Sequence, residues 1–281
     1  MAELTRLANG VTVAIDPMDG AQSASIGLYA AVGSRSEGEG KGGLAHLVEH
    51  MVFKGARGRD ARGIAEAIED VGGSLNAWTA RDQTVFHART LAPDVGLGLE
   101  LIADLVRAPK LDEDELEREK LVILSELGEC LDAPDDLIHD YLFEAAYGDQ
   151  PVARPVLGRE PSIRAITRAD CTTWLADQYR PERLVISAAG KVDPGHILNL
   201  AEQGFGEVED MPGIDFARGG DHQALGTILI GQPSRAVRAG DRVDAQFAAE
   251  HRTRHGLVAI GRFEQIIVDQ VVGGIEALAQ L

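Results

Sequence analysis

Residues 43–51 have the sequence Gly-Leu-Ala-His-Leu-Val-Glu-His-Met, and this stretch says more about the fold than any other. Its polar positions are His46, Glu49 and His50, in the order H-x-x-E-H. On a helix, residues four apart project from one face about one turn apart. Two imidazoles at that spacing can bind one zinc ion, and Glu49 lies near the same face without being a ligand. The stretch therefore predicts a helix that carries part of a zinc site.

A catalytic zinc site needs a third protein ligand and keeps its fourth position open. Residues 111–127 predict a helix that offers carboxylates, with Asp112 as its N-cap. Glu119 and Glu126 are seven residues apart, which places them two turns apart along one face. Glu126 follows His50 by 76 residues. An isolated H-x-x-E-H string also fits two structural histidines, but a carboxylate helix downstream favours the metal site.

This combination resembles the pitrilysin and mitochondrial processing peptidase family, whose H-x-x-E-H order is the inverzincin signature. The resemblance is to the N-terminal domain of that family, and is closest to bacterial proteins similar to the processing peptidase beta subunit. It runs from about Leu4 to Pro212. Four further segments contribute to it: the hairpin at residues 4–15 with its Asn9-Gly10 turn, GGSLNAWT at 72–79, DAPDD at 132–136 and YRPERLV at 179–185.

The resemblance implies a role for each polar residue of the site. Zinc is bound by His46, His50 and Glu126. Glu49 takes a proton from a zinc-held water as general base and passes it to the leaving amine, while zinc polarises the scissile carbonyl. Glu119 orients a histidine ligand through its ring N–H. The alternative for Glu119 is an ordinary surface residue of a charged helix.

Substrate binding is also implied by the resemblance, at Asn76 and Ala77 on a predicted edge strand. In the family, this strand takes up the substrate peptide by β-augmentation, which needs free backbone groups. Asn76 is also a candidate for holding the backbone at the scissile bond. The alternative is a strand residue beside a turn. The expected cofactor is Zn²⁺, because two imidazoles favour borderline metals over magnesium.

The predicted strands are grouped in blocks and so are the helices, and hairpin turns join neighbouring strands. This order predicts an α+β fold with a mostly antiparallel sheet covered by helices. The charge pattern changes near residue 214: the chain carries −18 in total, but Asp215 onward has eight acidic and seven basic residues and no lysine. We expect a zinc-binding metallopeptidase domain at residues 1–213. Residues 214–281 form a divergent or truncated tail, too short for the second, similar domain with which the family continues.

The predicted elements follow from hydrophobic periodicity and turn residues. Strands are expected at residues 4–7, 11–15, 23–32, 74–79, 84–91, 184–189 and, in the tail, 227–230. Helices are expected at the H-x-x-E-H stretch and at residues 59–71, 95–108, 111–127, 135–147, 162–178, 194–205 and, in the tail, 263–281.

Composition limits the class of protein. The net charge of −18 argues against nucleic-acid binding. It would suit a basic substrate, because an acidic cleft steers cations. The alternative, which is the more common case, is that many bacterial cytoplasmic proteins are simply acidic. No window resembles a membrane span, and charged residues break up the first stretch, so no signal peptide is expected. Two cysteines, Cys130 and Cys171, do not form a disulfide framework, which favours a cytoplasmic location.

Three functions remain open from the sequence. The first is a zinc endopeptidase that acts on short or extended peptides. The second is a catalytically incomplete subunit or truncated half, which binds metal and peptide but needs a partner chain to cleave. That partner is a related subunit in a heterodimer or a second copy in a homodimer. The third is a structural zinc domain, against which an open coordination position and Glu49 both argue.

Overall fold

The computed structural model describes residues 3–206 of the chain. The predicted domain boundary near residue 214 and the tail elements at 227–230 and 263–281 lie outside the described residues. Within residues 3–206, no helix is both long and apolar enough to span a bilayer.

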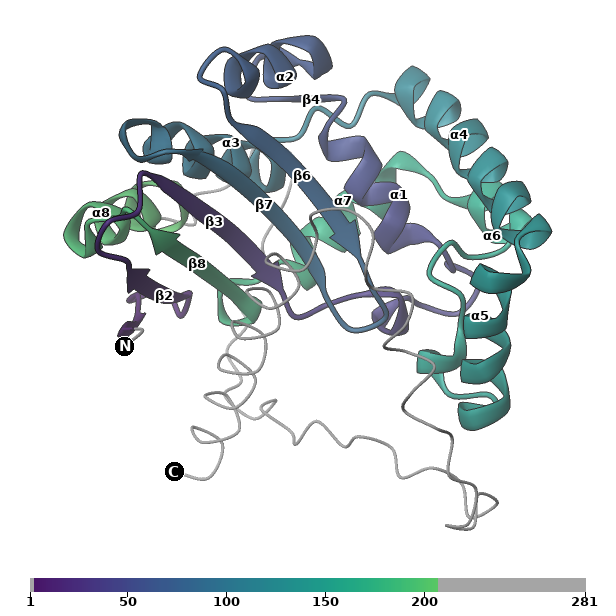
Figure 1. Cartoon of the computed structure of the whole chain (residues 1–281). Coiled ribbons are helices and arrows are strands. Elements are labelled where there is room, and N and C mark those ends of the chain that lie inside the picture. The colour runs from purple at the N-terminus through teal and green to yellow at the C-terminus, as the bar shows by residue number, and fades with distance from the viewer. Residues whose placement is uncertain (1–2, 207–281) are drawn as a thin grey trace, which may run out of the picture. The chain divides into compact units, whose positions relative to one another are not determined.

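One layer of the fold is a six-stranded sheet (Figure 1). Its strands are β1 (Glu3–Arg6), β2 (Thr12–Pro17), β3 (Ser23–Ala30), β6 (Ser74–Thr79), β7 (Thr84–Leu91) and β8 (Leu184–Gly190). They lie in the order β1-β2-β8-β3-β7-β6, and every neighbouring pair is antiparallel except β2 and β8. The predicted α+β fold with a mostly antiparallel sheet is therefore confirmed. A short hairpin is formed by β4 (Gly55–Ala56) and β5 (Arg59–Asp60).

Helices cover the sheet and extend beyond one edge of it (Figure 1). They are α1 (Leu44–Val52), α2 (Ala61–Glu69), α3 (Val95–Arg107), α4 (Glu113–Asp132), α5 (Pro134–Tyr147), α6 (Glu160–Ala165), α7 (Arg168–Gln178) and α8 (Pro194–Phe205). Helix α3 packs on β3, β7 and α8. Helix α1 contacts the edge strand β6 on one side and α4 on another, so it lies between the sheet and α4 (Figure 1).

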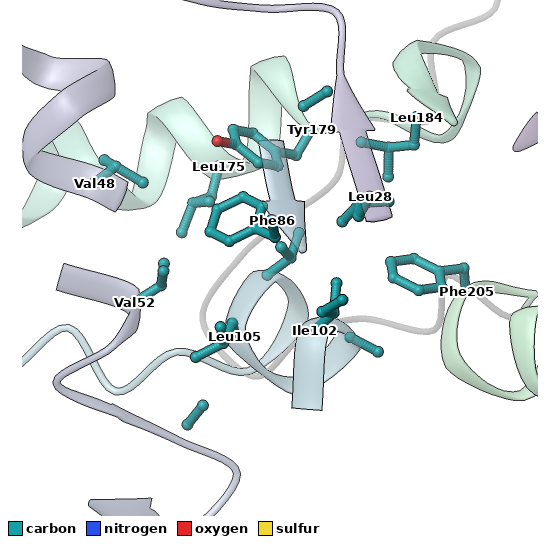
Figure 2. Packing of buried hydrophobic residues seen from close by; sticks show 14 of the residues in the cluster. Leu28, Val48, Val52, Phe86, Ile102, Leu105, Leu175, Tyr179, Leu184 and Phe205 are labelled. Atoms are coloured by element: carbon teal, nitrogen blue, oxygen red, sulfur yellow. The ribbon is translucent and has the colours of Figure 1, made fainter. Parts of the chain in front are cut away.

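The hydrophobic core anchors helix α1. Figure 2 shows Val48 and Val52 of this helix pointing toward the cluster that contains Phe86, Leu105 and Leu175. Each fully buried valine or leucine contributes roughly 1.5–3 kcal/mol relative to an exposed one. The six buried side chains of α1 leave its three polar ones on the remaining face, so core packing fixes the direction in which they point.

Three predicted helices have other bounds in the structure. The helix expected at residues 111–127 is α4, which begins at Glu113, after its N-cap Asp112, and continues to Asp132. The helix expected at residues 59–71 begins later, because Arg59 and Asp60 pair with β4 and the Asp60 carboxylate accepts the Gly63 N–H at 2.8 Å as N-cap. The stretch expected at 162–178 is divided into α6 and α7. Thr167 interrupts it with an extended backbone, and its side chain caps α7.

Candidate metal centre

The start of α1 is fixed by a buried carboxylate. Glu37 is 4% exposed and accepts the N–H groups of Gly43 at 3.1 Å and Ala45 at 2.8 Å. These donors have no partner inside the helix. Burial raises the pKa of Glu37 to about 8, and the two N–H donors oppose that rise. Gly43 has φ of 90°, and a Cβ there would lie 2.6 Å from the Leu157 carbonyl oxygen, so glycine is required. The first turn of α1 is therefore rigidly placed.

The structure brings His46, His50 and Glu126 together. The two Nε2 atoms of the histidines lie 3.2 Å apart, and Glu126 Oε2 lies 3.9 Å from each of them. Nitrogen ligands at about 2.0–2.1 Å from a tetrahedral zinc ion are separated by about 3.3 Å. The donor set therefore fits zinc, with a small inward movement of the carboxylate. Among residues 3–206, no other group of histidine, cysteine or acidic side chains converges in this way.

The ring of His50 is oriented by Glu119. Nδ1 of His50 lies 3.1 Å from Glu119 Oε2, and a carboxylate only accepts, so the ring nitrogen donates. In the neutral ring, the lone pair is then on Nε2, which faces His46 Nε2. Glu119 is 5% exposed, so it is not an ordinary surface residue of its helix.

His46 is suited to bind a metal in its neutral form. Burial, followed by the nearby His50 ring, lowers the pKa of His46 to about 4. The ring is therefore uncharged near neutral pH, as a metal ligand must be. Its Nδ1 atom is buried and has no hydrogen-bond partner among the described residues. The ring is thus held mainly by packing.

Glu49 lies beside the three candidate ligands without joining them. Its Oε2 atom accepts the hydroxyl of Thr79 at 2.5 Å. Burial raises the pKa of Glu49, the Thr79 hydrogen bond and His50 oppose that rise, and the Glu126 charge adds to it. A raised pKa brings a carboxylate closer to the range in which it both accepts and returns a proton at neutral pH.

Thr79 and Glu37 are residues that the sequence did not single out for the site. Thr79 is the last residue of β6 and reaches α1 because that strand forms the sheet edge next to the helix. Glu37 lies in a loop six residues before Gly43, the N-cap residue of α1, and so lies outside the usual capping position. Thr79 ends the segment GGSLNAWT at residues 72–79, which contributed to the family resemblance, so the sequence did offer a signal for it. Glu37 lies in no such segment.

Asn76 and Ala77 lie on β6, which is the terminal strand in the sheet order, as expected for an edge strand. They precede Thr79 by three and two positions. Asn76 is exposed, and its Oδ1 accepts the N–H of Ala77 at 2.9 Å. A peptide that pairs with this N–H would first displace the Asn76 side chain.

Residues 12–160 match the family model described as Insulinase (Peptidase family M16). The chain belongs to peptidase family M16. The matched segment contains all the polar residues of the metal centre, and the predicted resemblance to the pitrilysin and processing peptidase family is confirmed. Family M16 is a family of zinc metallopeptidases, and curated relatives of this chain carry the name zinc protease.

Curated relatives are longer than this M16 chain, and each matches it over only part of its own length. An uncharacterized zinc protease of Mycobacterium leprae is 39% identical over 202 residues, covering 72% of this chain and 45% of the relative. The mitochondrial-processing peptidase subunit beta of Saccharomyces cerevisiae is 36% identical over 204 residues, covering 73% and 44%. The chain thus spans about half the length of the curated relatives it matches.

Solved structures share the fold. A protease from Helicobacter pylori superposes with a TM-score of 0.70 at 25% identity, over 76% of this chain and 53% of that one. A peptidase M16 inactive domain from Pseudomonas fluorescens gives 0.68 at 26% identity, over 73% and 50%. Because one of these domains is described as inactive, the M16 fold alone does not decide activity, and the site residues must.

Proposed function

We propose that this M16 chain is a zinc-dependent endopeptidase that hydrolyses peptide bonds of short or extended peptides. The observation that carries the proposal is the convergence of His46, His50 and Glu126, with the buried carboxylate of Glu49 beside them. A structural zinc site closes its coordination with a fourth protein ligand. Among the described residues, the group offers three, which leaves a position for substrate or water.

In the proposed mechanism, each residue has one task. His46, His50 and Glu126 hold the metal, and Glu119 keeps the His50 ring turned toward it. A zinc ion at this point would polarise the scissile carbonyl and lower the pKa of water. Glu49 accepts the proton of the attacking water and delivers it to the leaving amine.

The substrate peptide is proposed to add to the free edge of β6, beside Asn76 and Ala77. Backbone pairing gives affinity for an extended chain without requiring a particular side chain. Because Thr79 of the same strand touches Glu49, a peptide on this edge runs toward the general base. The net charge of −18 further favours basic peptides.

We expect the Thr79→Val variant to keep its zinc and lose kcat. A hydrogen bond to a charged group contributes roughly 1.5–3 kcal/mol, and about 1.4 kcal/mol corresponds to tenfold in rate. On that scale, kcat falls by about 10- to 100-fold if the bond positions the Glu49 carboxylate. Thr79→Ser keeps the donor hydroxyl and is the matched control. Equal losses in both variants, measured by steady-state peptide cleavage, would argue against this positioning.

A second candidate function is that of a subunit that needs a partner chain to cleave. One relative, the mitochondrial-processing peptidase subunit beta of Saccharomyces cerevisiae, carries the name of a subunit. Large apolar side chains also lie exposed on two adjacent helices, a feature typical of protein–protein contacts. They are Leu121, Val122 and Leu131 on α4 and Ile138, Tyr141 and Leu142 on α5.

One experiment separates the two candidates. The full chain is purified without chelators, its zinc content and molecular mass in solution are measured, and cleavage of a quenched fluorescent peptide is followed. Bound zinc with cleavage by the monomer supports the endopeptidase. Bound zinc with cleavage only in a dimer, or after a related M16 subunit is added, supports the partner-dependent subunit. Absence of stoichiometric zinc contradicts both.

A further inference from the structure

Lys54 contacts the metal centre through Glu119. Its Nζ atom lies 2.6 Å from Glu119 Oε1, while the other oxygen of that carboxylate accepts from His50 Nδ1 at 3.1 Å. One carboxylate therefore joins an ammonium group to a candidate zinc ligand. The sequence alone did not predict a role for Lys54.

The position of Lys54 makes this contact a link between two helices. The backbone N–H of Lys54 donates to the Met51 carbonyl at 3.1 Å, so Lys54 lies just past the end of α1. A positive charge at this end of a helix is favoured by the helix dipole. Glu119 is on α4, two turns before Glu126. The ion pair therefore ties the helix of the two histidines to the helix of the third candidate ligand.

Burial explains why the carboxylate needs this partner. The Glu119 side chain is 6% exposed and that of Lys54 is 30% exposed. A buried carboxylate that loses its cation is strongly destabilised where it is, because the charge is left without compensation. Without Lys54, we expect the Glu119 side chain to turn toward solvent, which leaves the His50 ring free to rotate.

We propose that Lys54 is a positioning residue of the metal centre, which holds Glu119 in the orientation that aims His50 Nε2 at the metal. This inference rests on the proposed function, since it assumes that His50 binds zinc. Lys54 touches neither substrate nor metal. It acts through Glu119.

The sign of the effect separates positioning from simple electrostatics. Removal of a cation near a Zn²⁺ site lowers charge repulsion and, by itself, tightens zinc binding. Loss of the Glu119 orientation weakens zinc binding. Residues that support metal ligands typically contribute about 10- to 100-fold in metal affinity. The proposal therefore predicts weaker binding on removal of a positive charge.

The test compares four variants of the full chain by zinc competition with a chelator. Lys54→Met is expected to weaken zinc affinity by about tenfold, the lower end of the range for supporting residues. Glu119→Gln is expected to weaken it by at least as much. The double variant should bind no more weakly than Glu119→Gln alone, because Lys54 acts only through that carboxylate. The matched control is Lys110→Met, since Lys110 pairs with Asp112 at 3.6 Å, away from the metal centre.

A second readout excludes a general loss of structure. Thermal unfolding of each zinc-free variant is measured, and the Co²⁺-substituted forms are compared by visible absorption, which reports ligand geometry. An altered cobalt spectrum in Lys54→Met, absent from Lys110→Met, supports the proposal. Unchanged or tighter zinc binding by Lys54→Met, or additive losses in the double variant, overturn it while leaving the proposed function intact. Failure of the wild type to bind zinc overturns both.

Discussion

Replacement of Glu49 by glutamine is expected to leave zinc binding intact and to lower kcat by about 10²- to 10⁴-fold, the usual contribution of a general base. The amide has nearly the same shape as the carboxylate and can still accept the Thr79 hydroxyl through its carbonyl oxygen. It cannot take a proton from water at neutral pH. Since Glu49 is not among the three converging ligand residues, the metal should remain bound.

The measurement pairs zinc content with single-turnover cleavage of a quenched peptide by the wild type and the variant. Glu69→Gln makes the same chemical change at an exposed position on α2 and should retain wild-type activity. Wild-type turnover by Glu49→Gln would remove this residue from the mechanism. Loss of zinc together with activity would instead show that Glu49 supports the metal site.

The polar face of α1 was predictable because it depends on local geometry alone. The spacing of His46, Glu49 and His50 on one helix determines that they share a face, whatever packs around them. The choice of Glu126 needed more, because nothing local says which helix packs against α1. The family resemblance supplied that prediction, and in the structure Glu126 Oε2 lies 3.9 Å from Nε2 of each histidine.

Residues that act across elements were not predictable from local patterns. Thr79 reaches Glu49 only because β6 is the sheet edge next to α1, and Lys54 reaches Glu119 only because α4 packs on that helix. The parallel pairing of β2 with β8 was also not predictable from local patterns, because nearly the whole described chain separates the two strands in sequence. Periodicity predicts both strands but not their partners.

Glu126 is the candidate ligand whose replacement tests the centre most directly. Its side chain is 39% exposed, and it comes from a different helix than the histidines. We expect Glu126→Gln to weaken zinc affinity by more than about 100-fold, beyond the range of residues that only support ligands. The amide is a poor zinc ligand, and the substitution removes the negative charge that offsets the metal.

The same substitution should barely change the stability of the zinc-free chain, because Glu126 is only partly buried and substitutions near the surface usually alter the free energy of unfolding by no more than about 0.5 kcal/mol. Chelator competition gives the affinity, and thermal unfolding of the zinc-free form gives the stability. Glu129→Gln, exposed on the same helix, is the matched control. Wild-type zinc affinity in Glu126→Gln would mean that His46 and His50 share the metal with a different third residue. Loss of zinc affinity in Glu126→Gln but not in Glu129→Gln would instead show that α1 and α4 both supply ligands to one metal site. The packing of these two helices would then be a condition for zinc binding.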